Sequence, residues 1–318
     1  MESRALWNRR LIVVAGKGGV GRTTVALALA LALARRGKRT LLVEINVPDR
    51  VGALFGRPPI GASIVDLAPN LQAVNIEPHA ARKEYGLLVL RYEFIYNRVF
   101  ENSLVRGFLN AFPGLDDLNI LGKIWFHEGE RDKAGRPRFD AIVVDAPPTG
   151  NASYLFRLPH VMVDAIRVGP LVEKAKEMRA LVTDPRKTAL VLVALPEEMP
   201  VNEAIDFSRL NDAKIHIPAG YGVVNAYTDS PLSEREQEDF RRLRSHATDV
   251  PGLAALVAAH DAKHFRHRIE RGHVDKFVRE LSMPHLKVAR RFGGEMGRRE
   301  IDAISAEIEQ QVNEKPLA

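Results

Sequence analysis

A glycine-rich segment near the start of the chain has the residue types and spacing to bind phosphate. It reads AGKGGVGRTT, Ala15 to Thr24, and follows the pattern G-x-x-x-x-G-K-[ST] except that Arg22 stands where the pattern has lysine. Glycines let the backbone turn so that several N–H groups point at phosphate oxygens, and the start of a following helix adds its positive dipole end. A second cation, Lys17, follows the first glycine, where the pattern makes no demand.

Oxygen-bearing residues in and beyond this segment could complete a site for a nucleotide with magnesium. Thr23 would place its hydroxyl on the ion. Asp145 ends an apolar run and is followed by APPTG, so its carboxylate would stand at the end of a strand, where the magnesium shell is held. The N–H of Gly150 could sense a terminal phosphate. The residues that we expect to contact nucleotide here are Gly16, Lys17, Gly18, Gly19, Val20, Gly21, Arg22, Thr23, Thr24, Pro147 and Gly150.

The elements around the loop predict a parallel crossover. Residues 10–16 form an apolar run ending in glycine, typical of a buried parallel strand. Residues 23–37 alternate Ala and Leu, both strong helix formers, and end on a basic turn and a glycine, so we predict a helix there. Further strands are predicted at 38–46, from 139, from 188 and from 220. The fold class is therefore α/β, a mainly parallel sheet flanked by helices.

A helical insertion interrupts this order between the second and third strands that the sequence shows. We place it at residues 78–132 within a single domain of residues 1–318, and predict mostly helix from Ser233 onward. Its aromatic residues at helical spacing are interpreted as ordinary core, and a groove for a protein client is the alternative. They are Tyr85, Tyr92, Phe94, Tyr96, Phe100, Phe108 and Phe112.

Composition narrows the classes of protein. The chain has no cysteine, which excludes disulfides, cysteine–zinc sites and thiol nucleophiles and agrees with a reducing cytoplasm. We expect no signal peptide, and the longest apolar stretch, TTVALALALALA, is too short to cross a bilayer. The net charge of +6 is interpreted as solvated helix faces rather than a nucleic-acid surface. The stripe Ile301, Ile304, Ile308 and Val312 is expected to pack on its own domain rather than anchor the chain to membrane.

Several motifs, in order, resemble one family. GKGGVGRTT is similar to the deviant phosphate loop shared by ParA/MinD partitioning ATPases and arsenical-pump ATPases. DAPPTGNASYLFRLP, the segment through LPEEMPVNEAIDF and GVVNAY resemble the second group much more than the first. The resemblance runs from about Leu11 to Pro284 and identifies an arsenical-pump-like ATPase, in the family that includes the targeting factor for tail-anchored membrane proteins. It implies ATP and Mg²⁺ as cofactors.

The resemblance also assigns roles to single residues. Lys17 looks like the signature lysine that reaches the partner's phosphates across a dimer, Asn225 like the adenine-contacting Asn, and Glu197 like an interfacial nucleotide-contacting Glu. Pro284 is assigned to the loop that flanks the base. A loop cannot easily aim two cations at its own phosphate, so one can serve a neighbour, and one loop per chain then implies a homodimer or a heterodimer with a paralogue.

Three positions depart from the family pattern. Arg22 replaces the loop lysine with a planar, bulkier fork. Asn46 replaces an Asp, and Ala53 replaces the Asp that orients the attacking water, a loss that typically costs about 10²- to 10⁴-fold in rate. Asp49 stands nearby and could substitute, so the candidate catalytic residues are Lys17, Arg22 and Asp49.

These observations leave three hypotheses. The first is an ATP-driven dimeric switch that does not bind arsenite, because it has no metalloid-binding thiols. The second is a hydrolysis-deficient subunit that supports a catalytically intact paralogue. The third is a partitioning-type ATPase that binds DNA through its basic C-terminal region.

Overall fold

The computed structural model describes residues 6–46, 48, 51–77, 115–165, 170–228, 232–244, 251–292, 296–315 and 317. Within them, eight strands form one sheet in the order β3-β4-β2-β5-β1-β6-β7-β8. All neighbouring strands are parallel except β3 and β4. The strands are β1 Leu11–Gly16, β2 Thr40–Ile45, β3 Val65–Ala68, β4 Leu71–Ile76, β5 Ala141–Asp145, β6 Thr188–Ala194, β7 Ala219–Tyr227 and β8 His285–Ala289.

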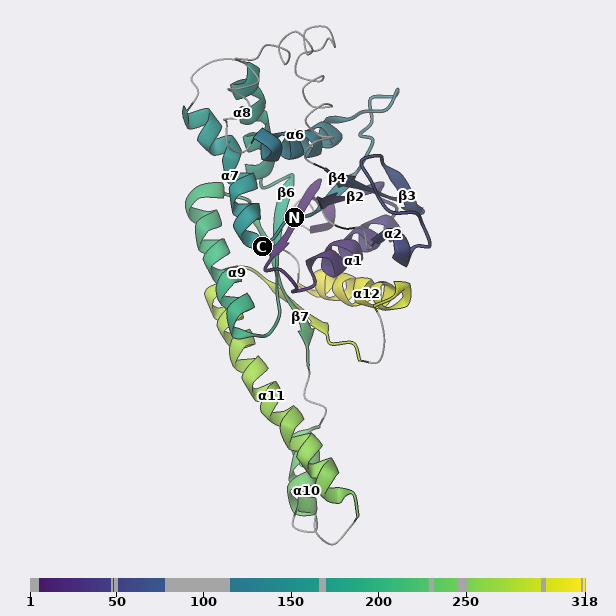
Figure 1. The fold of residues 1–318 in the computed structure, drawn as a ribbon, viewed down its shortest axis with the longest axis vertical. Coiled ribbons are helices and arrows are strands. Elements are labelled where there is room, and N and C mark those ends of the chain that lie inside the picture. Colours follow the sequence, from purple (N-terminus) through teal and green to yellow (C-terminus); the bar gives the residue numbers. More distant parts are fainter. Residues whose placement is uncertain are drawn as a thin grey trace.

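Helices cover both faces of the sheet, as expected for a parallel sheet. The α-helices are α1 Arg22–Arg35, α2 Val51–Leu54, α6 Leu115–Gly129, α7 Thr149–Ala165, α8 Pro170–Thr183, α9 Glu198–Leu210, α10 Glu234–Arg244, α11 Leu253–Glu280 and α12 Arg298–Glu314. A 3₁₀ turn, Leu6–Asn8, precedes β1, and a π-helical turn, Asn211–Ile215, follows α9. Helices α1 and α12 lie on one face, and α7, α9 and α11 on the other (Figure 1). The predicted α/β class is confirmed.

The central strand β1 divides the core into two layers. Leu11 and Val13 point into one apolar cluster, which includes residues of α6, α7, α8 and α9. Ile12 and Val14 point into the other, which includes α1 and α12. Because strand side chains alternate between faces, a strand buried on both faces must be apolar throughout, and β1 is.

Helix α1 is buried on nearly every side. All residues from Val25 to Ala34 are buried, between the sheet and α12. The alternation of Ala and Leu therefore belongs to a helix that is buried on nearly all sides, not to a strand with one face exposed to solvent. The predicted helix over 23–37 is confirmed, with ends at Arg22 and Arg35.

The sequence prediction missed three strands. Strands β3 and β4 lie between β2 and the insertion, so α6 follows the fourth strand in chain order, and β8 interrupts the C-terminal region that was predicted as mostly helical. β3 and β8 are the two edge strands, and β4 is the next strand in from β3. Edge strands are short and half solvated, so polar residues such as Asp66 and Lys287 break the apolar run on which the prediction relied.

The insertion predicted at 78–132 is described only from Leu115 onward. There α6 packs Leu118, Leu121 and Ile124 into the core with α7. The seven aromatic residues assigned to it lie outside the described residues, so their interpretation as core or client groove stays a prediction.

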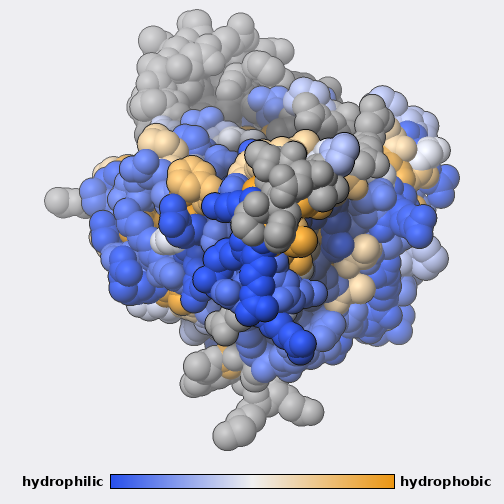
Figure 2. Space-filling model, turned by 90° about the horizontal axis from the view of Figure 1, so that it is seen from below, coloured by the Kyte–Doolittle hydropathy of each residue, from blue (hydrophilic) through white to orange (hydrophobic). Residues whose placement is uncertain are grey.

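Helix α11 is 28 residues long and extends past the sheet to α10 (Figure 1). Seen from that end, the surface is mostly hydrophilic with scattered apolar side chains (Figure 2). Among the described residues, no helix combines the length and hydropathy that crossing a membrane requires.

The C-terminal helix α12 packs on α1. Ile301, Ile304, Ile308 and Val312 are at most 3% exposed, which confirms that this stripe packs on its own domain. Polar contacts border the stripe: Arg36 pairs with Glu309 at 2.8 Å.

We predict different outcomes for two neighbouring truncations in α12. Ile304→Ala should lower the free energy of unfolding by about 2–5 kcal/mol, because it leaves a cavity against α1. Ser305→Ala should cost nothing or stabilise, because the buried Ser305 hydroxyl has no hydrogen-bond partner among the described residues. Urea unfolding of both variants measures this. Equal destabilisation by the two would contradict the packing described.

Candidate nucleotide-binding site

The glycine-rich loop joins β1 to α1 at the carboxyl edge of the sheet. Gly19 and Gly21 have φ values of 84° and 86°, in the left-handed region that glycine adopts without a steric penalty. A Cβ at Gly21 would also collide with the side-chain amide of Asn225 in β7. That amide donates a hydrogen bond to the carbonyl oxygen of Val20 at 2.8 Å. The shape of the loop therefore depends on a side chain from a distant strand.

The loop borders a cavity of about 400 Å³, within the size range of small-molecule sites. Its walls come from the loop, the first turns of α1, α2 and the segment entering α12. The lining residues are Gly19, Gly21, Arg22, Thr23, Thr24, Leu27, Val51, Leu54, Met296 and Ile301. Five predicted nucleotide contacts thus border one cavity, and Lys17 is not among its lining residues.

Thr23 and Asp145 meet at the base of the loop. The Thr23 hydroxyl donates to Asp145 Oδ2 at 2.6 Å. Asp145 is 4% exposed, and its Oδ1 is buried with no hydrogen-bond partner among the described residues. Burial raises the pKa of Asp145, although the Thr23 hydrogen bond and the Arg22 charge oppose the shift. A free carboxylate oxygen beside a hydroxyl fits Mg²⁺, which takes one or two carboxylates and completes its shell with phosphate oxygens and waters.

The side chain of Arg22 extends from the loop to the segment that follows β5. Its guanidinium donates to the carbonyl oxygen of Ala146. Burial lowers the pKa of Arg22, while the charges of Asp145 and Glu203 raise it, and an arginine remains protonated in proteins. A positive charge therefore stands beside the cavity, held by the segment after β5 rather than free in solvent.

Lys17 does not line the cavity and pairs with α9 instead. Its ammonium nitrogen lies 2.6 Å from Glu203 Oε2 in α9. The other oxygen of Glu203 accepts a hydrogen bond from the hydroxyl of Thr149, the first residue of α7. Sequence reasoning did not single out Glu203 or Thr149, because only the fold brings α9 and α7 to the loop.

Other predicted residues lie at the same edge of the sheet without a described contact to the loop. Pro147 is half-buried and Gly150 is exposed in the first turn of α7. Glu197 is exposed at the start of α9 and makes no side-chain capping hydrogen bond. Ala53 is exposed in α2, and Asn46 follows β2 with a φ of 46°. Asp49 lies outside the described residues.

The structure does not bring Pro284 to the loop. It precedes β8, and its carbonyl accepts a hydrogen bond from the N–H of Gly222 at 2.9 Å. Because β7 and β8 are parallel and their register pairs Gly222 with His285, Pro284 lies at the amino end of β8 and not in a loop that follows it. Met296, in the segment between β8 and α12, lines the cavity instead.

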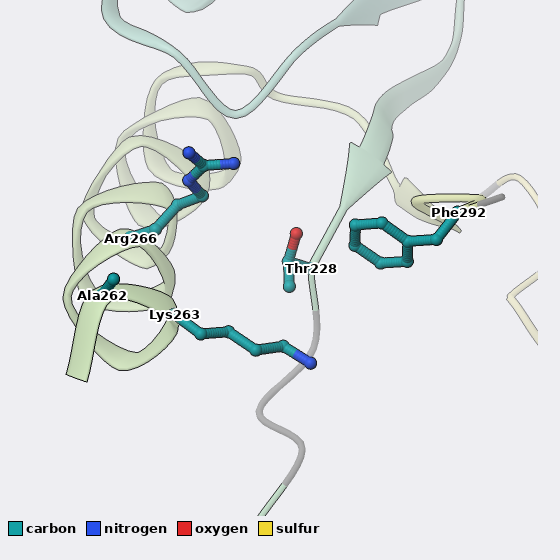
Figure 3. Close-up of a pocket in the computed structure, with 5 residues that line it drawn as sticks. All are labelled: Thr228, Ala262, Lys263, Arg266 and Phe292. Carbon is teal, nitrogen blue, oxygen red and sulfur yellow. The ribbon is translucent and has the colours of Figure 1, made fainter. Parts of the chain in front are cut away.

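A second cavity, of about 330 Å³, lies beyond the end of β7. Thr228 and Phe292 border it together with Ala262, Lys263 and Arg266 of α11 (Figure 3). It shares no lining residue with the first cavity, so we treat it as separate from the loop site.

Comparison with known proteins decides the family. Residues 9–168 match the family described as anion-transporting ATPase, and this match covers half of the 318 residues. The chain belongs to the anion-transporting ATPase family. The matched part holds the loop, Thr23, Asp145 and Thr149, whereas Glu203 and Asn225 lie beyond it.

Three relatives of this ATPase family member extend the similarity past the matched part. ATPase BagA of Mycobacterium tuberculosis is 31% identical over 251 residues, 77% of this chain and 72% of the relative. An arsenical pump-driving ATPase of Escherichia coli is 30% identical over 74% of this chain and 44% of its own length. ATPase GET3 of Kluyveromyces lactis is 27% identical over 61% of this chain and 65% of its own. The predicted membership of the arsenical-pump-like ATPases is confirmed.

We predict that Gly21→Ala weakens ATP binding by this family member at least tenfold. The added Cβ meets the Asn225 amide and forces alanine into left-handed backbone, so the loop must move. Isothermal titration with ATP and Mg²⁺ measures the change. Gly61→Ala is the matched control, because its Cβ would meet no atom within 4 Å and its φ is not positive. Unchanged affinity in Gly21→Ala would contradict the role given to the loop.

Proposed function

We propose that this protein is a magnesium-dependent ATPase that works in the cytoplasm as a nucleotide-driven dimeric switch. The observation that carries the proposal is that the two cations of the loop, Arg22 and Lys17, lie in different surroundings. Arg22 lines the cavity, whereas Lys17 does not line it and pairs with Glu203 of α9. Lys17 can therefore serve a second subunit, as an arginine finger acts in trans.

The magnesium part of the proposal rests on Thr23 and Asp145. Together they offer a hydroxyl and a carboxylate, one oxygen of which has no hydrogen-bond partner in the part of the chain that the structure describes. Among the described residues, no group of three or more His, Cys, Asp or Glu side chains could hold a metal ion. The ion would therefore bind together with the nucleotide, whose phosphate oxygens supply the remaining ligands.

Arsenite is not the proposed cargo. One relative is named an arsenical pump-driving ATPase, but this chain has no cysteine with which to bind a metalloid as a thiolate. Another relative is ATPase GET3, and a protein client on the 78–132 insertion remains a prediction. Adding arsenite should leave the rate of ATP hydrolysis unchanged.

We expect ATP with Mg²⁺ to double the molar mass of the protein in solution, and ADP to leave it as a monomer. Light scattering coupled to size exclusion measures this. Lys17→Ala should abolish the dimer without weakening ATP binding more than about threefold, because Lys17 lies outside the cavity. A mass that stays monomeric with ATP and Mg²⁺ would overturn the homodimeric switch, and doubling on addition of a paralogue would replace it with a heterodimer.

A second candidate function is a subunit that binds ATP but hydrolyses it poorly and supports a paralogue. Ala53 favours it, because an exposed alanine in α2 carries no group to orient a water molecule. Arg22 adds to this, since its guanidinium is held by Ala146.

Restoring the missing carboxylate separates the two functions. If the chain is hydrolysis-deficient, Ala53→Asp should raise single-turnover hydrolysis by about 10²-fold, within the range of a lost water-orienting group. If the native chain already turns over and Asp49→Ala abolishes hydrolysis, Asp49 supplies the function and the subunit hypothesis fails. Gly61→Ala again serves as the neutral control.

A further inference from the structure

Glu203 connects two segments that a nucleotide would contact separately. Its Oε2 lies 2.6 Å from the Lys17 ammonium, and its Oε1 accepts the Thr149 hydroxyl. Lys17 belongs to the phosphate-binding loop, and Thr149 begins α7 directly after the segment that follows β5. One carboxylate therefore joins the loop to the segment expected to sense a terminal phosphate.

Helix α9, which carries Glu203, is held by polar contacts with α11 and by burial of its apolar residues. Lys276 of α11 donates to Asn202 Oδ1 at 2.6 Å, and Arg209 pairs with Glu280 of α11 at 3.1 Å. Apolar residues of α9, such as Val201 and Ala204, are buried in the core. Glu203 therefore belongs to a helix that packs in the core, whereas Lys17 and Thr149 belong to segments expected to contact nucleotide.

The groups around the Glu203 carboxylate are ones that could bind a phosphate in its place. Burial raises the pKa of Glu203, but hydrogen bonds from Lys17 and Thr149 and the charges of Lys17 and Arg22 outweigh it, so the pKa lies below its usual value. The group is thus an anion at neutral pH. An ammonium, a hydroxyl and a nearby guanidinium are also typical donors to phosphate oxygens.

We propose that Glu203 is a positioning residue that holds Lys17 on its own chain until nucleotide and partner are present. The inference rests on the proposed dimeric switch. In the free chain Lys17 is paired in cis, so a second subunit must compete with Glu203 for it. When nucleotide moves the segment from Asp145 to Gly150, Thr149 leaves Glu203, the carboxylate loses a donor, and Lys17 can exchange it for a phosphate across the interface.

The expected strength of the Lys17–Glu203 ion pair follows from the solvent exposure of the two side chains. The Lys17 side chain is 36% exposed and that of Glu203 31%. Exposed ion pairs are weak, so this one shifts an equilibrium by roughly two- to fivefold and does not lock it. Glu203 therefore tunes the ATP concentration at which the dimer forms.

The first test needs no nucleotide. Reductive methylation of the free chain, read by peptide mass spectrometry, reports the reactivity of the Lys17 amine. Glu203→Gln keeps the size of the side chain and removes its charge, so Lys17 should react about two- to fivefold faster. Asp206→Asn, in the same helix and 75% exposed, is the matched control and should leave the Lys17 rate unchanged.

The second test measures dimerisation. Glu203→Gln should lower the ATP concentration for half-maximal dimer about threefold, whereas adding Glu203→Gln to Lys17→Ala should not restore the dimer, because Glu203 acts through Lys17. Glu203→Ala repeats the experiment if the glutamine variant misfolds. An unchanged Lys17 reaction rate, or the same dimer midpoint in native and Glu203→Gln protein, would overturn the inference while the dimeric switch stands. If no variant dimerises although Lys17 reacts faster, the dimeric switch itself fails and the role of Glu203 fails with it.

Discussion

The pairing of β1 with β5 is the constraint on which the rest of the site depends. Their register places Val14 beside Asp145. The glycine loop, which follows β1, therefore begins close to the carboxylate that ends β5. Thr23, one residue into α1, then reaches Asp145 at 2.6 Å. A shift by one residue would turn Asp145 toward the opposite face, because strand side chains alternate. The apolar residues of both strands, buried in two separate layers, fix that register.

The same adjacency concentrates charge at one edge of the sheet. Asp145 is nearly enclosed, and a buried carboxylate is costly unless it is paired or bound to a cation. In the free chain Thr23 satisfies one of its oxygens and Arg22 supplies a nearby positive charge. The other oxygen of Asp145 is buried without a hydrogen-bond partner among the described residues, which leaves part of the free-energy cost of burial. Binding Mg²⁺ would offset that cost.

The phosphate-binding loop could be predicted from the sequence, but its surroundings could not. The glycines, Thr23 and Asp145 were predictable because each is fixed by a local rule: a turn, a helix start, a strand end. Glu203 was not, since its role depends on how α9 lies across the carboxyl edge of the sheet. The strand β8, which Pro284 precedes, was missed for a related reason: an edge strand with Lys287 in it lacks the apolar run that reveals a strand.

Three of the charged groups around the loop already have partners among the described residues. Lys17 is paired with Glu203, Arg22 with the Ala146 carbonyl, and Asp145 with Thr23. In the proposed function a nucleotide replaces these internal partners, and its affinity then reflects only the difference in free energy between the new interactions and the internal ones. Two of these partners, Ala146 after β5 and Glu203 in α9, belong to segments outside the loop, which would sense the exchange. A loop whose cations were free would bind phosphate as well but would transmit nothing, so the internal partners are what can make the site a switch.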